Sequence, residues 1–194
     1  MISVSAHNNS VVFAPVLSPD GVMLLKLDLR EEEKFSPISQ RLTSIITDPD
    51  TVSAIYIAWE AIRVRIGESV NDLSIDLDDE SFHCLSRSKL RLEGDSISLA
   101  AYLKFFTLFD NQFTSYQCIV ATGAIRKNLL GYSVDRVDGV REKLGKSCLI
   151  KNQHQRTAIV LPKLNVKELD ISNSVNDIWT ANQSLSFHCQ YTAN

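Results

Sequence analysis

The segment Glu93-Gly94-Asp95-Ser96 leads directly into a stretch in which large apolar residues recur at helical spacing. These residues are Leu99, Tyr102, Leu103, Phe106 and Phe109. Residues three and four positions apart share one face of a helix, so the stretch predicts a helix whose apolar face is buried. The Gly and Asp before it are typical turn residues, and Ser96 stands where the helix begins. This turn and helix organise the rest of the chain around them.

The segments upstream predict a hairpin, a long helix and a strand. Two apolar runs, 11–15 and 22–29, flank Ser18-Pro19-Asp20-Gly21, whose Pro and Gly favour a tight turn. A helix opens at Ser36-Pro37 and is interrupted at Asp48-Pro49-Asp50. It resumes near Thr51 and ends at Gly67, with apolar residues on one stripe. Alternation over 73–77 predicts a half-buried strand, and a further strand is expected at 82–84 or at 90–92.

The segments downstream predict several buried strands and two short helical stretches. Apolar runs indicate strands at 118–121, 147–150 and 157–161. A short helix capped by Asp138 is expected between the first two, and a mostly helical segment over 166–179. Strands and helices do not alternate as regular βαβ units. The chain 1–194 therefore predicts a single α+β domain with a mixed sheet and flanking helices.

Composition excludes several classes of protein. The chain has 194 residues, with 20 basic and 23 acidic side chains and a formal charge of -3. This balance is ordinary for a globular protein and lacks the basic excess of a nucleic-acid-binding domain, so no nucleic acid partner is predicted. No apolar run is long enough to span a membrane, and the N-terminus has no signal-peptide pattern. We expect a cytoplasmic protein with no membrane partner, and free thiols at Cys84, Cys118, Cys148 and Cys189.

Motifs for metals and nucleotides are absent or incomplete. The cysteines form no C-x-x-C pair, and the histidines at 7, 83, 154 and 188 lack metal-ligand spacing, so no metal site is predicted. Gly145-Lys146-Ser147 has the ending of a phosphate-binding loop, but Val140 stands where that loop needs its first glycine. It also follows a helix, where the loop would follow a strand. No cofactor is therefore expected in this chain.

Ser96 has two interpretations. A serine at a helix N-terminus is commonly a cap. It also suits a nucleophile, because the positive end of the helix dipole and the N–H groups of the first turn can stabilise an oxyanion. A serine hydroxyl needs a base to react near neutral pH, so the choice depends on residues elsewhere in the chain.

Five segments in order, taken together, resemble the proteolytic domain of Lon-type proteases. They are Asp72-Leu73-Ser74-Ile75-Asp76-Leu77, Gly94-Asp95-Ser96, Thr122-Gly123-Ala124-Ile125, Gly139-Val140-Arg141-Glu142-Lys143-Leu144 and Val160-Leu161-Pro162. In that family a D-L-x-V-x-V strand precedes a G-P-S-A-G segment with the nucleophile. T-G-E-I, then G-G-L-K-E-K-L with the catalytic lysine, then an apolar strand ending in I-P follow. The resemblance covers about residues 50–180 and extends to about residue 10 through the hairpin.

The resemblance implies a fold of the ribosomal protein S5 domain 2-like type and assigns roles to residues. Ser96 matches the nucleophile of a Ser–Lys dyad, with Thr122 in a supporting position. Arg141 stands in the position of the catalytic lysine. Since a guanidinium stays protonated in proteins, Arg141 cannot act as base. Lys143 can replace it only if the register slips, because two residues along a helix turn by about 200°.

Two smaller departures separate the chain from the family pattern. Asp95 replaces the proline before the serine, and Ser98 replaces the glycine two residues after it. Lys127 and Lys104 are further alternatives for the base. The resemblance also implies a peptide or protein substrate, a homo-oligomeric ring, and ATP only through an ATPase partner on another chain or domain.

The sequence leaves three interpretations of the chain open. The first is a Lon-like serine endopeptidase with Ser96 as nucleophile. The second is a Lon-like domain that has lost its activity and serves as an assembly or binding module, as in some DNA-repair and defence ATPases. The third is an unrelated α+β domain whose matches arise by chance.

Overall fold

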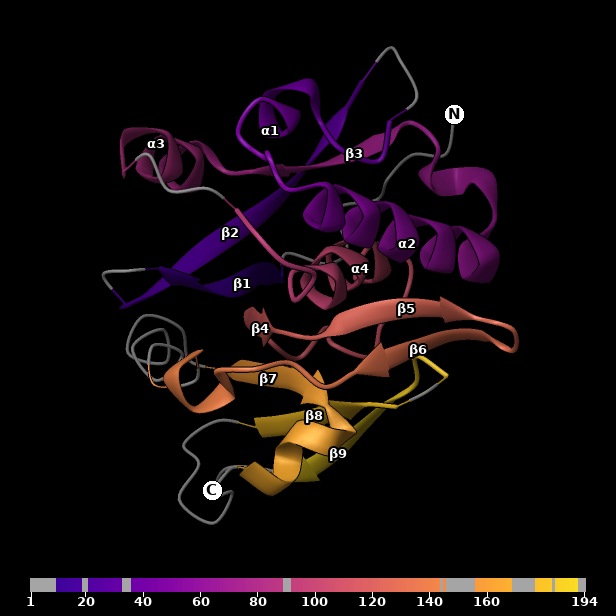
Figure 1. Cartoon of the computed structure of the whole chain (residues 1–194). Helices are drawn as coiled ribbons and strands as arrows, with labels where there is room; N and C mark the ends of the chain where they lie inside the picture. The colour runs from indigo at the N-terminus through magenta and orange to yellow at the C-terminus, as the bar shows by residue number, and fades with distance from the viewer. Residues whose placement is uncertain are drawn as a thin grey trace.

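The computed structural model describes residues 10–18, 21–32, 36–88, 92–143, 145, 156–168, 177–182 and 184–191. Within these ranges the strands form a seven-stranded mixed sheet in the order β3-β2-β1-β4-β7-β8-β9 and a separate two-stranded sheet, β5-β6 (Figure 1). The main sheet is antiparallel at its two ends and parallel between β1, β4, β7 and β8. Together with the flanking helices, this confirms the predicted α+β class.

The strands have the following bounds: β1 Val11–Ser18, β2 Gly21–Glu31, β3 Leu73–Leu77, β4 Cys118–Ala121, β5 Ala124–Asn128, β6 Gly131–Asp135, β7 Thr157–Pro162, β8 Asp177–Ala181 and β9 Phe187–Tyr191. The helices are α1 Gln40–Thr43, α2 Pro49–Ile66, α3 Asp79–Ser88 and α4 Ser98–Phe106, with 3-10 turns η1 Glu68–Val70 and η2 Lys163–Glu168.

Helix α4 forms the centre of the molecule. It packs against α2 on one side and against strands β1, β2 and β4 on the other, as Figure 1 shows. Consequently its side chains are buried on every face, with Tyr102, Phe105 and Phe106 fully enclosed. A helix with two packed sides needs apolar residues all round, not only on the stripe that the sequence indicated. Phe109, expected on that stripe, lies beyond the end of the helix and is partly exposed.

Helix α2 begins where the sequence indicated an interruption. Asp48 is its N-cap, and its carboxylate accepts hydrogen bonds from the N–H groups of Asp50 and Thr51. Pro49 occupies the first helical position, where a missing N–H costs nothing. Gly67 ends the helix with φ +85°, as expected. The short α1 is a separate turn capped by Ser39.

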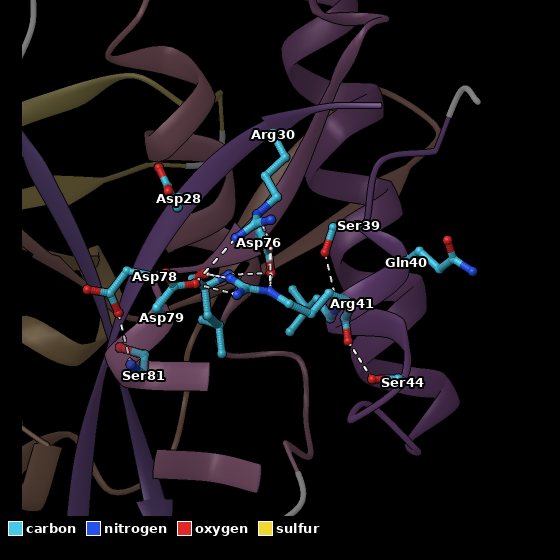
Figure 2. Close-up of polar contacts among 12 residues, drawn as sticks. Asp28, Arg30, Ser39, Gln40, Arg41, Ser44, Asp76, Asp78, Asp79 and Ser81 are labelled. Carbon is cyan, nitrogen blue, oxygen red and sulfur yellow. Dashed lines mark hydrogen bonds and ion pairs between the residues drawn. The ribbon is translucent and has the colours of Figure 1, made fainter. Parts of the chain in front are cut away.

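A buried carboxylate joins α1, β2 and β3. The Asp76 side chain is fully buried and pairs with Arg30 from β2 and with Arg41 from α1, whose Nε lies 3.1 Å from Asp76 Oδ2 (Figure 2). The two arginines also contact Asp79, which is mostly exposed. Burial of a carboxylate is tolerated when ionic and hydrogen-bonding partners surround it. Besides the two arginines, the Leu77 N–H donates a hydrogen bond to Asp76 Oδ1 at 2.8 Å. This cluster connects α1, β2, β3 and the start of α3.

Two expectations about secondary structure were wrong in part. Residues 82–84 belong to helix α3, which Asp78 caps by accepting a hydrogen bond from the Ser81 N–H, and the other position given for that strand, 90–92, lies outside the described residues except for Leu92. Of the expected helical segment at 166–179, residues 166–168 belong to η2 and residues 177–179 to strand β8, while 169–176 lie outside the described residues. Residues 177–181 form a strand because they pair with β7, and the local sequence pattern does not predict that pairing. The expected strand at 147–150 lies outside the described residues.

Candidate active site

The turn before α4 is shaped by Gly94 and held by Gly123. Gly94 has φ +88°, a left-handed conformation that favours glycine. The carbonyl of Ser96 accepts a hydrogen bond from the Gly123 N–H at 3.0 Å, and the Gly123 carbonyl accepts one from the Leu99 N–H at 3.1 Å. Ser96 is partly exposed at the end of this turn. The turn between β4 and β5 therefore fixes the backbone of Ser96 directly.

Gly123 is required for this contact. A Cβ atom there would lie 2.8 Å from Leu99 Cδ2 and 3.2 Å from both Leu99 Cβ and Pro162 Cγ. The backbone of residue 123 thus lies against the first turn of α4, with no room for a side chain. The T-G pair that the sequence analysis singled out consequently places Thr122 next to Ser96.

Lys143 meets Ser96 from the opposite side. It lies on a helical turn over residues 140–143, where its N–H donates to the Gly139 carbonyl at 2.9 Å. Its Nζ lies 3.3 Å from Ser96 Oγ and 3.5 Å from Thr122 Oγ1. The residue is only 5% exposed. A lysine amine and a serine hydroxyl are thus within hydrogen-bonding distance in a largely enclosed position.

Burial lowers the pKa of Lys143 from its ordinary value. Desolvation disfavours the charged ammonium and is the largest cause, while the charges of Asp138 and Asp95 act in the opposite direction. The neutral amine, which can accept a proton, is therefore easier to populate here than on a lysine in water.

The placement of Arg141 corrects the expected register. Arg141 is exposed, and Lys143, two residues further along the same helical turn, is the buried one. Because a two-residue step rotates a helix by about 200°, the two side chains face different directions. The β5–β6 hairpin sets this register, since it decides where the chain returns to the serine. Lys143, not Arg141, is the residue whose amine lies at Ser96.

Thr122 connects the Lys143 side chain to the main sheet. It is 1% exposed, and its N–H donates to the Val160 carbonyl of β7 at 3.2 Å. Its hydroxyl oxygen accepts a hydrogen bond from Lys143 Nζ. Thr122 therefore contacts the same amine that lies at Ser96, while its supporting role stays a prediction.

The two residues that depart from the family pattern both have contacts at the site. Asp95 forms an ion pair with Arg126 of β5, and Arg126 Nε lies 3.9 Å from Asp135 of β6. Ser98 is buried, and its Oγ accepts a hydrogen bond from the Ile125 N–H at 2.8 Å and donates toward the Asp95 carbonyl at 2.8 Å. Both side chains tie the start of α4 to β5.

The alternative lysines lie elsewhere. Lys127 Nζ pairs with Glu60 of α2 at 2.8 Å. Burial also lowers the pKa of Lys104, but its charged neighbours are Asp28 and Lys26 on β2. Neither lysine is placed at Ser96.

Two residues near the serine escaped the sequence analysis. The carboxylate of Asp48 accepts a hydrogen bond from the Gly94 N–H at 2.8 Å, and the Thr51 hydroxyl donates to the Gly94 carbonyl at 2.8 Å. The Asp48-Pro49 pair was the available signal, since a capping residue before a proline typically starts a helix.

A groove on the surface lies along the tip of the β5–β6 hairpin. It measures about 1460 Å³, and its lining includes Val64, Arg65, Tyr102, Leu130, Lys163 and Leu185. Leu129 and Leu130, at the tip of the β5–β6 hairpin, are fully exposed beside it. Neither Ser96 nor Lys143 lines this groove.

Comparison of the chain with protein-family models and with curated proteins finds no match. Within the described residues no group of three or more His, Cys, Asp or Glu side chains is arranged to hold a metal ion. No helix in the same part of the chain has the length and apolar character needed to cross a membrane.

His7, His154, Cys148, Lys146 and Ser147 lie outside the described residues. Cys84 and Cys118 are free thiols, as expected.

Proposed function

We propose that this chain is a Lon-like serine peptidase in which Ser96 is the nucleophile and Lys143 the general base. The observation that carries the proposal is the 3.3 Å distance between Lys143 Nζ and Ser96 Oγ in a largely buried position. The ordered resemblance of five segments to Lon-type proteases supports it, and the shift from Arg141 to Lys143 removes the main objection to activity.

The reaction begins with proton transfer. The neutral amine of Lys143 takes the hydroxyl proton of Ser96 as Oγ attacks the carbonyl carbon of a peptide bond. The resulting oxyanion lies near the start of α4, where the positive end of the helix dipole favours negative charge. The ammonium of Lys143 then returns the proton to the leaving amine, and an acyl group remains on Oγ.

Hydrolysis of the acyl group repeats these roles with water as the nucleophile. Lys143 takes a proton from water, the water oxygen attacks the ester carbonyl, and Ser96 recovers its hydroxyl proton. Thr122 keeps the amine in place through both halves of the reaction. Each step uses side chains from this chain alone.

The test uses a peptidyl phosphonate that reacts covalently with activated serines. We expect the wild-type chain to be labelled, and mass spectrometry of its peptides to find the adduct on Ser96. The Ser96→Ala variant removes the nucleophile and is expected to stay unlabelled. Ser184→Ala, which removes an exposed hydroxyl on the β8–β9 connection, serves as the matched control.

Folding of each variant is checked by circular dichroism before labelling. A folded wild-type chain with no label on Ser96, over the whole range from pH 6 to 10, would rule out the peptidase. Equal labelling of the Ser96→Ala variant would do the same, because the label would then report another residue.

A second candidate function is an assembly module that forms homo-oligomers. The fully exposed Leu129 and Leu130 favour it, since solvated leucines next to a hollow are typical of interaction surfaces. The hairpin tip and the groove lie side by side, so two copies can each insert a tip into the other's groove, as a two-fold contact requires.

Light scattering after size exclusion tests the assembly module. The wild-type chain is expected to exceed the mass of one copy, and a Leu129→Asp, Leu130→Asp double variant is expected to be a monomer. A monomeric wild-type chain at about 100 µM would exclude self-assembly through this patch. The result is independent of Ser96 labelling, so the two candidates are separable.

A further inference from the structure

The N-terminus of α2 forms hydrogen bonds with the backbone of Gly94, two residues before Ser96. Asp48 and Thr51 belong to the first turn of α2, and Gly94 lies more than 40 positions later in the chain. A helix cap needs contacts only within its own helix, and Asp48 already has them with Asp50 and Thr51. The Asp48 carboxylate also accepts a hydrogen bond from the Gly94 N–H at 2.8 Å, a contact outside its own helix that capping does not require.

Thr51 forms the other hydrogen bond with Gly94, from a buried position. The residue is fully buried, and its hydroxyl oxygen lies 2.8 Å from both the Gly94 carbonyl oxygen and Asp48 Oδ2. Its one proton serves these two acceptors in turn. Both polar groups of the Gly94 backbone are thus held by α2, at the residue whose positive φ shapes the turn.

The turn is held on its other side as well. Gly123 binds the Ser96 carbonyl, and Arg126 binds the Asp95 side chain. The turn consequently has one set of contacts from β5 and the residues before it, at Asp95 and Ser96, and a second set from the N-terminus of α2, at Gly94.

We infer that Thr51 and Asp48 are positioning residues, which set the distance between Ser96 Oγ and Lys143 Nζ by fixing Gly94. The inference rests on the proposed function, since a position matters to the reaction only if Ser96 reacts. A displacement of about 1 Å of a reacting group can lower a rate about 100-fold. Loss of one of the two holding groups is therefore expected to reduce the rate without removing either reacting side chain.

The experiment compares Thr51→Val with Thr51→Ser in the full chain. Valine keeps the size of threonine and removes the hydroxyl, while serine keeps the hydroxyl. The probe is the same peptidyl phosphonate, and the readouts are the maximal rate of labelling, the half-saturating probe concentration and the pH profile. Thr107→Val is the matched control, because Thr107 is also buried and its hydroxyl bonds only to the nearby Lys104 carbonyl.

We expect Thr51→Val to lower the maximal labelling rate about 10- to 100-fold with little change in half-saturation. Its pH midpoint should move upward, because a looser turn admits water to the amine of Lys143. Thr51→Ser and Thr107→Val should stay within about threefold of the wild type. Asp48→Asn weakens the hydrogen bond to the Gly94 N–H, and its maximal labelling rate is expected to lie between that of Thr51→Val and that of the wild type. It replaces Thr51→Val if that variant does not fold.

Several results overturn the inference. Wild-type labelling kinetics in folded Thr51→Val or Asp48→Asn would show that the hydrogen bonds from Thr51 and Asp48 to Gly94 do not position Ser96. An equal loss in Thr107→Val would show that the effect is one of general stability. If the wild-type chain itself carries no label on Ser96, the proposed function fails and the inference falls with it. Labelled wild type with an unaffected Thr51→Val rejects the inference alone.

Discussion

Lys143 Nζ lies 3.3 Å from Ser96 Oγ, although 47 positions separate the two residues in the chain. The polypeptide between them passes through α4, strand β4 and the β5–β6 hairpin before it returns to the serine. Thr122, at the end of β4, contacts the same amine. Three segments therefore have to be in place before these side chains meet, and each can be tested by substitution.

Replacement of Lys143 by methionine should abolish most of the reactivity of Ser96. Methionine fills a similar volume but cannot accept a proton, so labelling is expected to slow by about 10²- to 10⁴-fold. The measurement is the second-order rate constant for the phosphonate. Arg141→Met is the control and should leave that constant unchanged, because Arg141 is exposed. A larger effect at Arg141 than at Lys143 would restore the register that the sequence suggested.

The rate of labelling should rise with pH. Burial lowers the pKa of Lys143 below its ordinary 10.5, so the amine becomes neutral at a lower pH than a solvated lysine. The rate is expected to be low while the amine is protonated and to level off above its folded-state pKa. Rates measured from pH 6 to 11 give the midpoint. A midpoint at or above 10.5 would contradict the effect of burial.

The same shift affects stability in a defined window. Between the lowered pKa of folded Lys143 and 10.5, the unfolded chain binds a proton that the folded chain does not. The contribution of this group to the free energy of unfolding therefore rises with pH across that window. Denaturant titrations of the wild type and Lys143→Met at several pH values measure it. The wild-type curve should approach that of the variant as the pH increases.

A methyl group at residue 123 should destabilise the protein and displace Ser96. In Gly123→Ala the new Cβ meets Leu99 and Pro162 at distances that force the first turn of α4 to move. We expect a loss of about 1–3 kcal/mol in the free energy of unfolding, together with slower labelling. Gly145→Ala is the matched control, because its Cβ would meet nothing within 4 Å. Equal stability of the two variants would contradict the close approach.

The two acidic partners of Arg41 should differ strongly in their contribution to stability. Asp76 is fully buried, so its replacement by alanine leaves two arginines without their shared carboxylate and should cost about 3–5 kcal/mol. Asp79 is mostly exposed, and solvent weakens its ion pairs, so Asp79→Ala should cost much less than Asp76→Ala. Urea titrations compare them. Similar losses for both would show that burial does not decide the strength of this cluster.

Much of the fold was predictable because local patterns agree with the final packing. The hairpin of β1 and β2, the end of α2 at Gly67 and the buried strands β4 and β7 all carry their own turn or periodicity signals. Strand β8 does not, because parallel pairing with β7 decides it. Helix α3 was missed since its sequence is polar and short, and capping by Asp78 is its main local signal.

The candidate site was predictable in part. Ser96 and Thr122 follow from motif order, and their contacts with Gly123 and Lys143 agree with it. The choice between Arg141 and Lys143 depends on how the hairpin returns the chain, which no spacing rule supplies. Asp48 and Thr51 reach the turn from a segment far away in sequence, so only the packing of α2 against α4 reveals them.

Enclosure of the Lys143 amine has a consequence for the life of the protein. On the ribosome, or after thermal denaturation, this side chain is an ordinary solvated cation and Ser96 is an inert alcohol. The altered basicity arises only once the hairpin and the turn at Gly123 have closed around it. Biosynthesis thus yields a chain without this altered basicity, and any hydrolytic capacity appears only with the folded structure.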